Sequence, residues 1–173
     1  MSIDRLKTAI RDVPDFPKKG ILFKDITPVL NDPALFKMAV DLFVDRHLKS
    51  RIDTVCAIEA RGFLFGAAVA YRLGAGVVPI RKKGKLPYET IEATYSLEYG
   101  TATLAVHVDA LRKGARVLLI DDLLATGGTA AASVRLVEQL GAQVVEVDFL
   151  VELAFLKGRE KLARQKVFAP IVF

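Results

Sequence analysis

The sequence predicts an α/β protein with a central, mainly parallel sheet flanked by helices. Apolar strand candidates alternate with helical patterns along most of the chain, which is the order that parallel sheets with helical crossovers produce. Two of the strands, in 53–62 and 117–129, run into short loops that open a helix at once. The length of 173 residues suits a single domain.

The N-terminal part of the sequence is expected to form a short helix, a loop, a short strand and a longer helix. Apolar residues at helical spacing between 3 and 13 indicate the first helix, which ends at a loop containing two prolines and a glycine. Residues 21–23 are expected to form the strand. The longer helix is expected to begin after Asp32, because an N-cap residue followed by proline favours a helix start, and to end near Leu48. His47 is then expected at the surface, at the end of this helix.

The middle of the chain continues the alternation. A buried strand is expected at 53–58, a helix follows it, and a third strand is expected at 77–80. The next twenty residues, 81–100, are basic at their start and polar and aromatic in their middle. A stretch of this length without regular structure is typical of a lid, although part of it could pair as a hairpin. Apolar residues alternate at 104–108 and predict the next strand.

The last third predicts the central strand at 117–120, a helix at 130–140 and a further strand at 143–151. A short helix is expected at 156–163, and 167–173 is expected to be a last strand or a tail. The carboxyl ends of parallel strands share one edge of a sheet, where ligands bind in such folds. The loops that follow the strands at 53–58 and 117–120 are therefore expected to face one pocket.

Composition excludes several function classes. The chain is 52% apolar and 26% charged, and it has no apolar run of the roughly 18 residues that a membrane helix needs. Its start lacks an apolar signal core, and Cys56 is its single cysteine, so we expect a reducing, cytoplasmic location. The net charge of +5 is spread along the chain. A substrate with many phosphate charges explains this excess without nucleic-acid binding.

The stretch 117–129 carries the strongest functional signal. Its apolar strand is followed by Asp121 and Asp122, where the strand is expected to end, and then by a loop of small residues. Unpaired N–H groups at the start of the next helix would converge on one point and bind a phosphate. Glycines allow the backbone to approach an anion closely. The loop residues are Ala125, Thr126, Gly127, Gly128 and Thr129.

The two acids distinguish this loop from other phosphate loops. A Walker loop needs a lysine before its Ser/Thr, and a dinucleotide loop needs three spaced glycines; neither pattern is present. Ionised carboxylates accept hydrogen bonds, so acids beside a phosphate cradle suit the hydroxyls of a ribose 5-phosphate. The alternative is a strand end with capping acids and a glycine-rich turn.

A second anion loop follows the strand at 53–58. It consists of Glu59, Ala60, Arg61 and Gly62, and it also opens a helix. Arg61 can make a bidentate contact with phosphate oxygens. Beside the first loop, it suggests a site for the pyrophosphate end of the same ligand.

The stretch 117–129 resembles the phosphoribosyl pyrophosphate (PRPP) signature of the type I phosphoribosyltransferases, and nearly the entire chain is similar to the adenine phosphoribosyltransferase family. The stretches that carry the second resemblance are 14–17, 20–28, 59–63, 81–82, 84–87, 95–100 and 150–153. The resemblance implies the type I phosphoribosyltransferase fold in one domain, 1–173. It also implies a small N-terminal hood at 1–30 that contributes to the base pocket, and a flexible catalytic lid at 81–100.

The family resemblance implies a purine salvage reaction. It joins N9 of adenine to C1′ of PRPP through an oxocarbenium-like transition state, and it gives AMP and pyrophosphate. The resemblance implies that Asp121 and Asp122 hold the ribose hydroxyls and that 125–129 wrap the 5′-phosphate. The groups implied for pyrophosphate are Glu59, Ala60, Arg61, Lys82 and Lys85. Those implied for adenine are Leu22, Phe23, Lys24 and Leu153.

Glu98, Tyr99 and Arg61 are the catalytic residues that the resemblance implies, with Glu98 as the suggested acid/base group. The resemblance also implies Mg²⁺ held mainly by PRPP and water, without direct protein ligands, and a homodimer. It implies neither a nucleic-acid nor a membrane partner.

Two other functions remain as alternatives. One is a regulator that binds PRPP to control transcription or RNA, and such proteins usually carry an added DNA-binding domain or a basic RNA surface. The other is an enzyme of the same class that uses guanine or hypoxanthine. Such relatives would be expected to lack the Pro-Asp-Phe-Pro and Glu-Tyr-Gly stretches.

Overall fold

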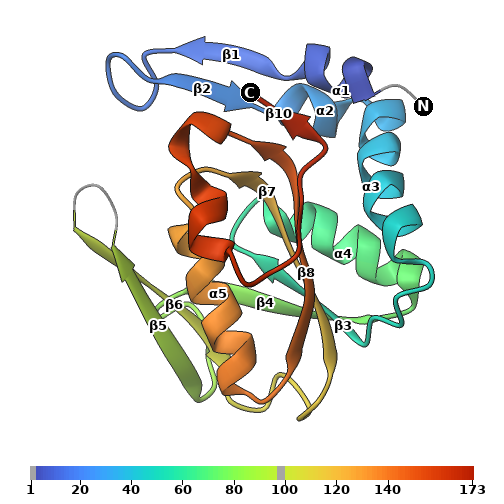
Figure 1. The fold of residues 1–173 in the computed structure, drawn as a ribbon, viewed down its shortest axis with the longest axis vertical. Coiled ribbons are helices and arrows are strands. Elements are labelled where there is room, and N and C mark those ends of the chain that lie inside the picture. Colours follow the sequence, from blue (N-terminus) through green and yellow to red (C-terminus); the bar gives the residue numbers. More distant parts are fainter. Residues whose placement is uncertain (1–2, 97–99) are drawn as a thin grey trace.

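The computed structural model describes residues 3–96 and 100–173 and confirms the α/β class with a mainly parallel sheet. In this part of the chain the strand order is β10-β8-β7-β3-β4-β6-β5, with β9 beside β8 (Figure 1). The pairs from β10 to β4 and the β8–β9 pair are parallel, and the β4–β6 and β6–β5 pairs are antiparallel. The bounds are β3 (Thr54–Ile58), β4 (Gly76–Lys82), β5 (Thr90–Ser96), β6 (Thr101–His107), β7 (Arg116–Leu124), β8 (Gln143–Glu152), β9 (Val167–Phe168) and β10 (Ile171–Val172).

Helices cover both faces of the sheet. On β7, Leu118 and Ile120 pack with α3 and α4, whereas Val117 and Leu119 pack with α5. This two-sided burial explains why the strand appears in the sequence as an uninterrupted apolar run. None of the helices described over 3–96 and 100–173 is long and apolar enough to cross a membrane. The helix bounds are α3 (Pro33–His47), α4 (Gly62–Leu73) and α5 (Gly128–Gln139).

The N-terminal segment lies at one end of the sheet, beside the C-terminus (Figure 1). It consists of α1 (Ile3–Ala9), β1 (Arg11–Pro14), β2 (Leu22–Asp25) and α2 (Thr27–Asn31). The prediction of a helix over 3–13 is wrong beyond Ala9, because β1 pairs antiparallel with β2 and forms a ladder. The predicted strand at 21–23 exists as β2.

Two other boundaries differ from prediction, whereas the pairing of part of 81–100 as a hairpin is confirmed. β7 continues through the two acids to Leu124, because β8 extends alongside it as far as Glu152. The helix predicted at 156–163 is replaced by two 3₁₀ turns, η1 (Ala154–Leu156) and η2 (Gly158–Leu162), separated by Lys157 with φ 54°. About a third of the predicted lid is the strand β5, which pairs along its length with β6.

Cys56 lies at the centre of the sheet, on β3 between β4 and β7. It is fully buried, and burial raises the pKa of its thiol to about 12 because a thiolate would be charged in an apolar environment. This placement agrees with a structural rather than a reactive cysteine.

The prediction that His47 lies at the surface is wrong. The residue is 2% exposed, and its Nε2 atom lies 2.8 Å from a carboxylate oxygen of Asp148 on β8. Arg46, the preceding residue, donates to both oxygens of Glu146 at 2.9 and 2.5 Å. The end of α3 is therefore attached to β8 by a polar cluster, and the helix period alone could not reveal these partners. Burial raises the pKa of Asp148 to about 6, although the hydrogen bond from His47 opposes the shift.

Asp148→Asn should change how stability depends on pH. The folded protein holds the Asp148 proton more tightly than the unfolded chain, so this proton contributes stability below about pH 4 and the contribution is lost as pH rises through about 6. The free energy of unfolding of the wild type, minus that of the variant, should fall by up to about 3 kcal/mol between these limits. Urea unfolding of both proteins at several pH values measures this difference in the free energy of unfolding. A difference that rises with pH would contradict the assignment.

Candidate functional site

The loop after β7 has the geometry of a phosphate site. β7 ends at Leu124, and α5 begins at Gly128 after an N-cap, Gly127, with φ 75°. The first backbone N–H groups of a helix have no partner within it, so those of the first turn of α5 are available to an anion. A cavity of about 70 Å³ lies inside the loop, lined by Asp121, 123–130 and Phe149. The structure thus places all five predicted phosphate residues around one small cavity.

The loop is held by backbone contact with η2, which the sequence did not indicate. A Cβ atom on Gly127 would lie 2.3 Å from the carbonyl oxygen of Gly158, and a Cβ atom on Gly158 would lie 2.3 Å from the carbonyl oxygen of Ala125. Both positions therefore require glycine. Gly158 was missed because it follows the loop by thirty residues in a segment without a clear period.

The two acids occupy different environments at the end of β7. Asp122 is 4% exposed, and its carboxylate accepts a hydrogen bond from Nε of Arg61 at 2.5 Å. The carboxylate of Asp121 accepts the backbone N–H of Asp122 at 2.8 Å. Burial, and then the negative charge of Asp122, raise the pKa of Asp121. Asp122 is therefore the acid with a cation beside it.

Glu59 organises the second anion loop. Its carboxylate accepts the backbone N–H of Lys82 at 3.0 Å and lies 3.3 Å from both Nε of Arg81 and Nζ of Lys85. Burial alone would raise the pKa of Glu59, but these donors and cations together lower it. Glu59 thus gathers cations at the carboxyl ends of β3 and β4.

One cavity brings the two loops together. It has a volume of about 320 Å³ and lies between the carboxyl ends of β3, β4 and β7. The residues that line it are Glu59, Ala60, Arg61, Lys82, Tyr95, Leu104, Asp121, Asp122, Leu123 and Thr129. The predicted ribose and pyrophosphate residues therefore share a pocket, except for Lys85, which reaches Glu59 from outside its lining. Tyr95 and Leu104 were not predicted for the site.

The four predicted adenine residues lie around the N-terminal segment and the end of β8. The ring of Phe23 is 5.5 Å from the guanidinium carbon of Arg61, which links this segment to the pocket. The amine of Lys24 is 2.5 Å from Asp12 and 4.0 Å from the centre of the Phe173 ring. Leu22 is exposed, and the N–H of Leu153 donates to Leu124 at 2.9 Å. Glu98 and Tyr99 lie outside the described residues.

Two of the three carboxylates that line the pocket are paired with cations, Asp122 with Arg61 and Glu59 with Arg81 and Lys85. This arrangement fits Mg²⁺ that arrives on phosphate oxygens and keeps its waters, rather than Mg²⁺ in a protein cage.

A second set of polar groups lies away from the pocket. The ligand atoms of His47, Glu146 and Asp148 lie within 4.8 Å of one another; His47 is hydrogen-bonded to Asp148, and Glu146 accepts hydrogen bonds from Arg46.

Gly158→Ala should disturb the phosphate loop from outside the loop sequence. The added methyl group would overlap the carbonyl of Ala125, so the loop must move, at a cost of about 1–3 kcal/mol in the free energy of unfolding. Binding of ribose 5-phosphate should weaken with it. Gly76→Ala is the matched control, because its nearest neighbour lies at 3.7 Å and no backbone strain is imposed. Equal stability of the two variants would contradict the role given to Gly158.

Known proteins resemble the chain over nearly its whole length. Residues 26–168 match the family model described as a phosphoribosyl transferase domain. The chain is 57% identical over 171 residues to the adenine phosphoribosyltransferase of Geotalea uraniireducens (strain Rf4), covering 99% of this chain and 100% of that relative.

Two solved structures show the same fold. The adenine phosphoribosyltransferase of Thermoanaerobacter pseudethanolicus matches with a TM-score of 0.95 and 53% identity, over 99% of this chain and 100% of that chain. That of Saccharomyces cerevisiae, complexed with D-2,5-dideoxy-2,5-imino-altritol 1,6-bisphosphate and adenine, matches with a TM-score of 0.93 and 44% identity, over 98% of each chain. The fold is therefore the predicted type I phosphoribosyltransferase fold. By sequence and by fold, the chain belongs to the adenine phosphoribosyltransferase family.

Proposed function

We propose that the protein transfers the 5-phosphoribosyl group of PRPP to N9 of adenine, giving AMP and pyrophosphate. The observation that carries this proposal is the 320 Å³ cavity, which is lined by the cations Arg61 and Lys82 together with Asp122 and Thr129. It offers cations at one end and a phosphate loop at the other, which is the charge pattern of a sugar with phosphates at both ends. The ligands of the yeast relative, a bisphosphate and adenine, support the same substrates.

PRPP would lie across the carboxyl ends of three strands. Its 5′-phosphate would occupy the loop 125–129, and its ribose hydroxyls would be held by Asp121 and Asp122. Its pyrophosphate would contact the loop 59–61 together with Lys82 and Lys85. In this orientation the cationic side chains would contact phosphate oxygens, and the carboxylates would accept hydrogen bonds from the ribose hydroxyls.

Binding would rearrange the ion pair between Arg61 and Asp122. In the structure the two side chains neutralise each other at 2.5 Å. The pyrophosphate would compete for the guanidinium, and the ribose hydroxyls would replace it as donors to the carboxylate. The resting pair thus keeps a nearly buried acid partnered until the substrate arrives.

The pocket suits a reaction in which positive charge grows on the sugar while pyrophosphate leaves. Arg61, Lys82 and Lys85 would stabilise the negative charge of the leaving group. Mg²⁺ bound to the phosphate oxygens would supply further charge neutralisation. Asp121 and Asp122 would hold the ribose so that C1′ faces the base. Glu98 is the proposed acceptor of the N9 proton, and Tyr99 is proposed as a further catalytic residue.

The adenine would bind between Leu22, Phe23 and Lys24 on one side and Leu153 on the other. The amine of Lys24 already contacts Asp12 and the ring of Phe173, which supports recognition of the base largely by backbone groups. In this arrangement 1–30 act as a hood over the base and 81–100 as a lid within a single domain. The cytoplasm is the proposed location.

We also propose a homodimer, formed through α4 and β4. Leu64, Ala67 and Tyr71 lie on one exposed face of α4, and Leu64 and Tyr71 are 49% and 86% exposed. Val77 on β4 is 51% exposed, and among the described residues β6 pairs with this strand only at Arg81 and Lys82. Exposed apolar side chains beside an unpaired strand edge favour association, and a two-fold axis would bring the same surface of a second copy against it.

Leu64→Glu should shift the protein toward monomers, because association would bury an unpaired charge in the apolar surface. Sedimentation velocity at micromolar concentration measures the change. Phe155→Glu is the control, since Phe155 is exposed on η1, away from α4 and β4. A wild type that sediments as a monomer would contradict the proposed dimer.

Activity should be measured as AMP formation from adenine, PRPP and Mg²⁺, with hypoxanthine and guanine in parallel. Asp122→Asn should lower kcat/KM for PRPP by roughly 100-fold, because an amide accepts ribose hydrogen bonds less strongly and leaves Arg61 without its charge partner. Asp45→Asn, an exposed change on α3, should match the wild type.

The two alternatives give different results in the same assay. Turnover with hypoxanthine or guanine, but not with adenine, would reject adenine as the acceptor base. No turnover with any base, together with retained PRPP binding, would favour the regulator.

A further inference from the structure

Tyr95 connects the β5–β6 hairpin with the start of α5. Its ring lies against Gly128, where a Cβ atom would be 2.9 Å from Cδ2 of the tyrosine. The hydroxyl of Thr129 donates to its phenol oxygen at 3.0 Å. The side chain thus contacts two residues of the phosphate loop, although it lies more than thirty residues before them in the sequence.

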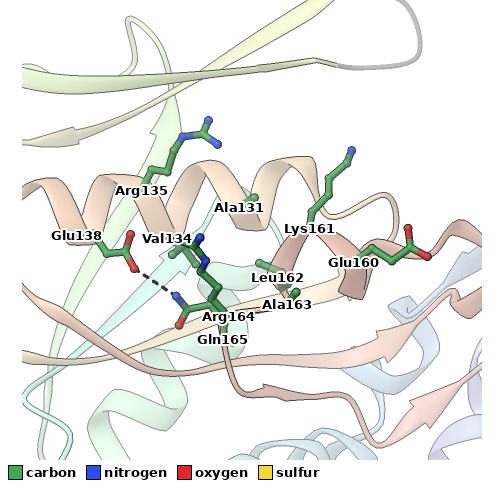
Figure 2. A pocket seen from close by; sticks show the side chains of 10 residues that line it. All are labelled: Ala131, Val134, Arg135, Glu138, Glu160, Lys161, Leu162, Ala163, Arg164 and Gln165. Carbon is green, nitrogen blue, oxygen red and sulfur yellow. Dashed lines mark hydrogen bonds between the residues drawn. The ribbon is translucent and has the colours of Figure 1, made fainter.

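A second contact fixes the hairpin against α5. The guanidinium of Arg135 donates to the carbonyl oxygen of Thr94 at 2.9 Å. Figure 2 shows Arg135 leaving α5 on the side of the hairpin, away from Glu138, which accepts a hydrogen bond from Gln165. Two neighbouring residues of β5 are therefore tied to α5 at separate points, which sets the position of the Tyr95 phenol.

The hydroxyl of Thr129 has one proton, and in the structure it donates this proton in a hydrogen bond to the phenol oxygen of Tyr95. A phosphate oxygen in the loop accepts hydrogen bonds, so Thr129 must turn its proton toward the phosphate. A phenol can donate as well as accept. Tyr95 can then reverse its role and donate to the threonine oxygen, which gives a chain from Tyr95 through Thr129 to the phosphate.

We propose that Tyr95 is a positioning residue for the 5′-phosphate, which acts by orienting and polarising the hydroxyl of Thr129. Hydrogen bonds in such a chain strengthen one another, so the phenol increases the donor strength of the threonine. Tyr95 also lines the 320 Å³ cavity with Arg61 and Asp122, where a bound sugar phosphate would cover it. This inference rests on the proposed function, because it takes 125–129 as the phosphate loop.

Tyr95→Phe keeps the ring on Gly128 and removes only the hydroxyl. By isothermal titration calorimetry it should bind ribose 5-phosphate about 3- to 10-fold more weakly than the wild type, and bind pyrophosphate equally well. In the activity assay KM for PRPP should rise by a similar factor, and KM for adenine should not change. Thr103→Val is the control, because it removes a hydroxyl contact with Thr94 from the same hairpin, away from the loop.

A double-mutant cycle separates positioning from general support of the fold. In a Thr129→Val background, Tyr95→Phe should change ribose 5-phosphate binding by less than about twofold, because the chain is already interrupted. An equal loss in both backgrounds, or no loss in the single variant, would overturn the proposal. So would a wild type that does not bind ribose 5-phosphate.

The same measurements distinguish this inference from the proposed function. A wild type that forms no AMP, but binds ribose 5-phosphate with the expected loss in Tyr95→Phe, rejects the activity and supports the role of Tyr95. A wild type that forms AMP, with an unaffected Tyr95→Phe variant, supports the activity and rejects the role.

Discussion

The ion pair between Arg61 and Asp122 joins the carboxyl ends of two adjacent parallel strands, and the arrangement of the pocket depends on it. Arg61 follows β3 and Asp122 lies near the end of β7, so the pair exists only because these strands are neighbours. An acid that is 4% exposed needs such a partner, since an unpaired charge in this position would cost several kcal/mol. The ribose and pyrophosphate groups of the proposed substrate would therefore be recognised by two residues that neutralise each other in the structure.

Backbone contact, rather than side-chain packing, shapes the phosphate loop. Gly127 and Gly158 approach each other so closely that neither position tolerates a Cβ atom, and Gly128 leaves room for the ring of Tyr95. The loop is thus enclosed by η2 on one side and by the β5–β6 hairpin on the other. Its N–H groups can remain directed at one small cavity without a ligand to hold them, which reduces the entropy that binding must overcome.

Much of this arrangement could be predicted from the sequence, because its determinants are local. The apolar run before Asp121, the small residues of 125–129 and the proline after Asp32 each specify an element through neighbouring residues. The errors occur where a distant partner decides. Residues 11–14 leave a helical pattern because β2 offers a ladder, His47 is buried because Asp148 meets it across a hundred residues, and Gly158 matters because the chain returns to the loop. Periodicity within a segment contains no information about such partners.

Cys56 has a practical consequence for work on this protein. It is the sole thiol of the sequence, and it is buried on β3 beside β7, the two strands that present Arg61 and Asp122. A thiol reagent can reach it only when these strands separate from their coverings. The rate at which the native protein is alkylated therefore reports directly on opening of the sheet beneath the pocket, without any engineered label.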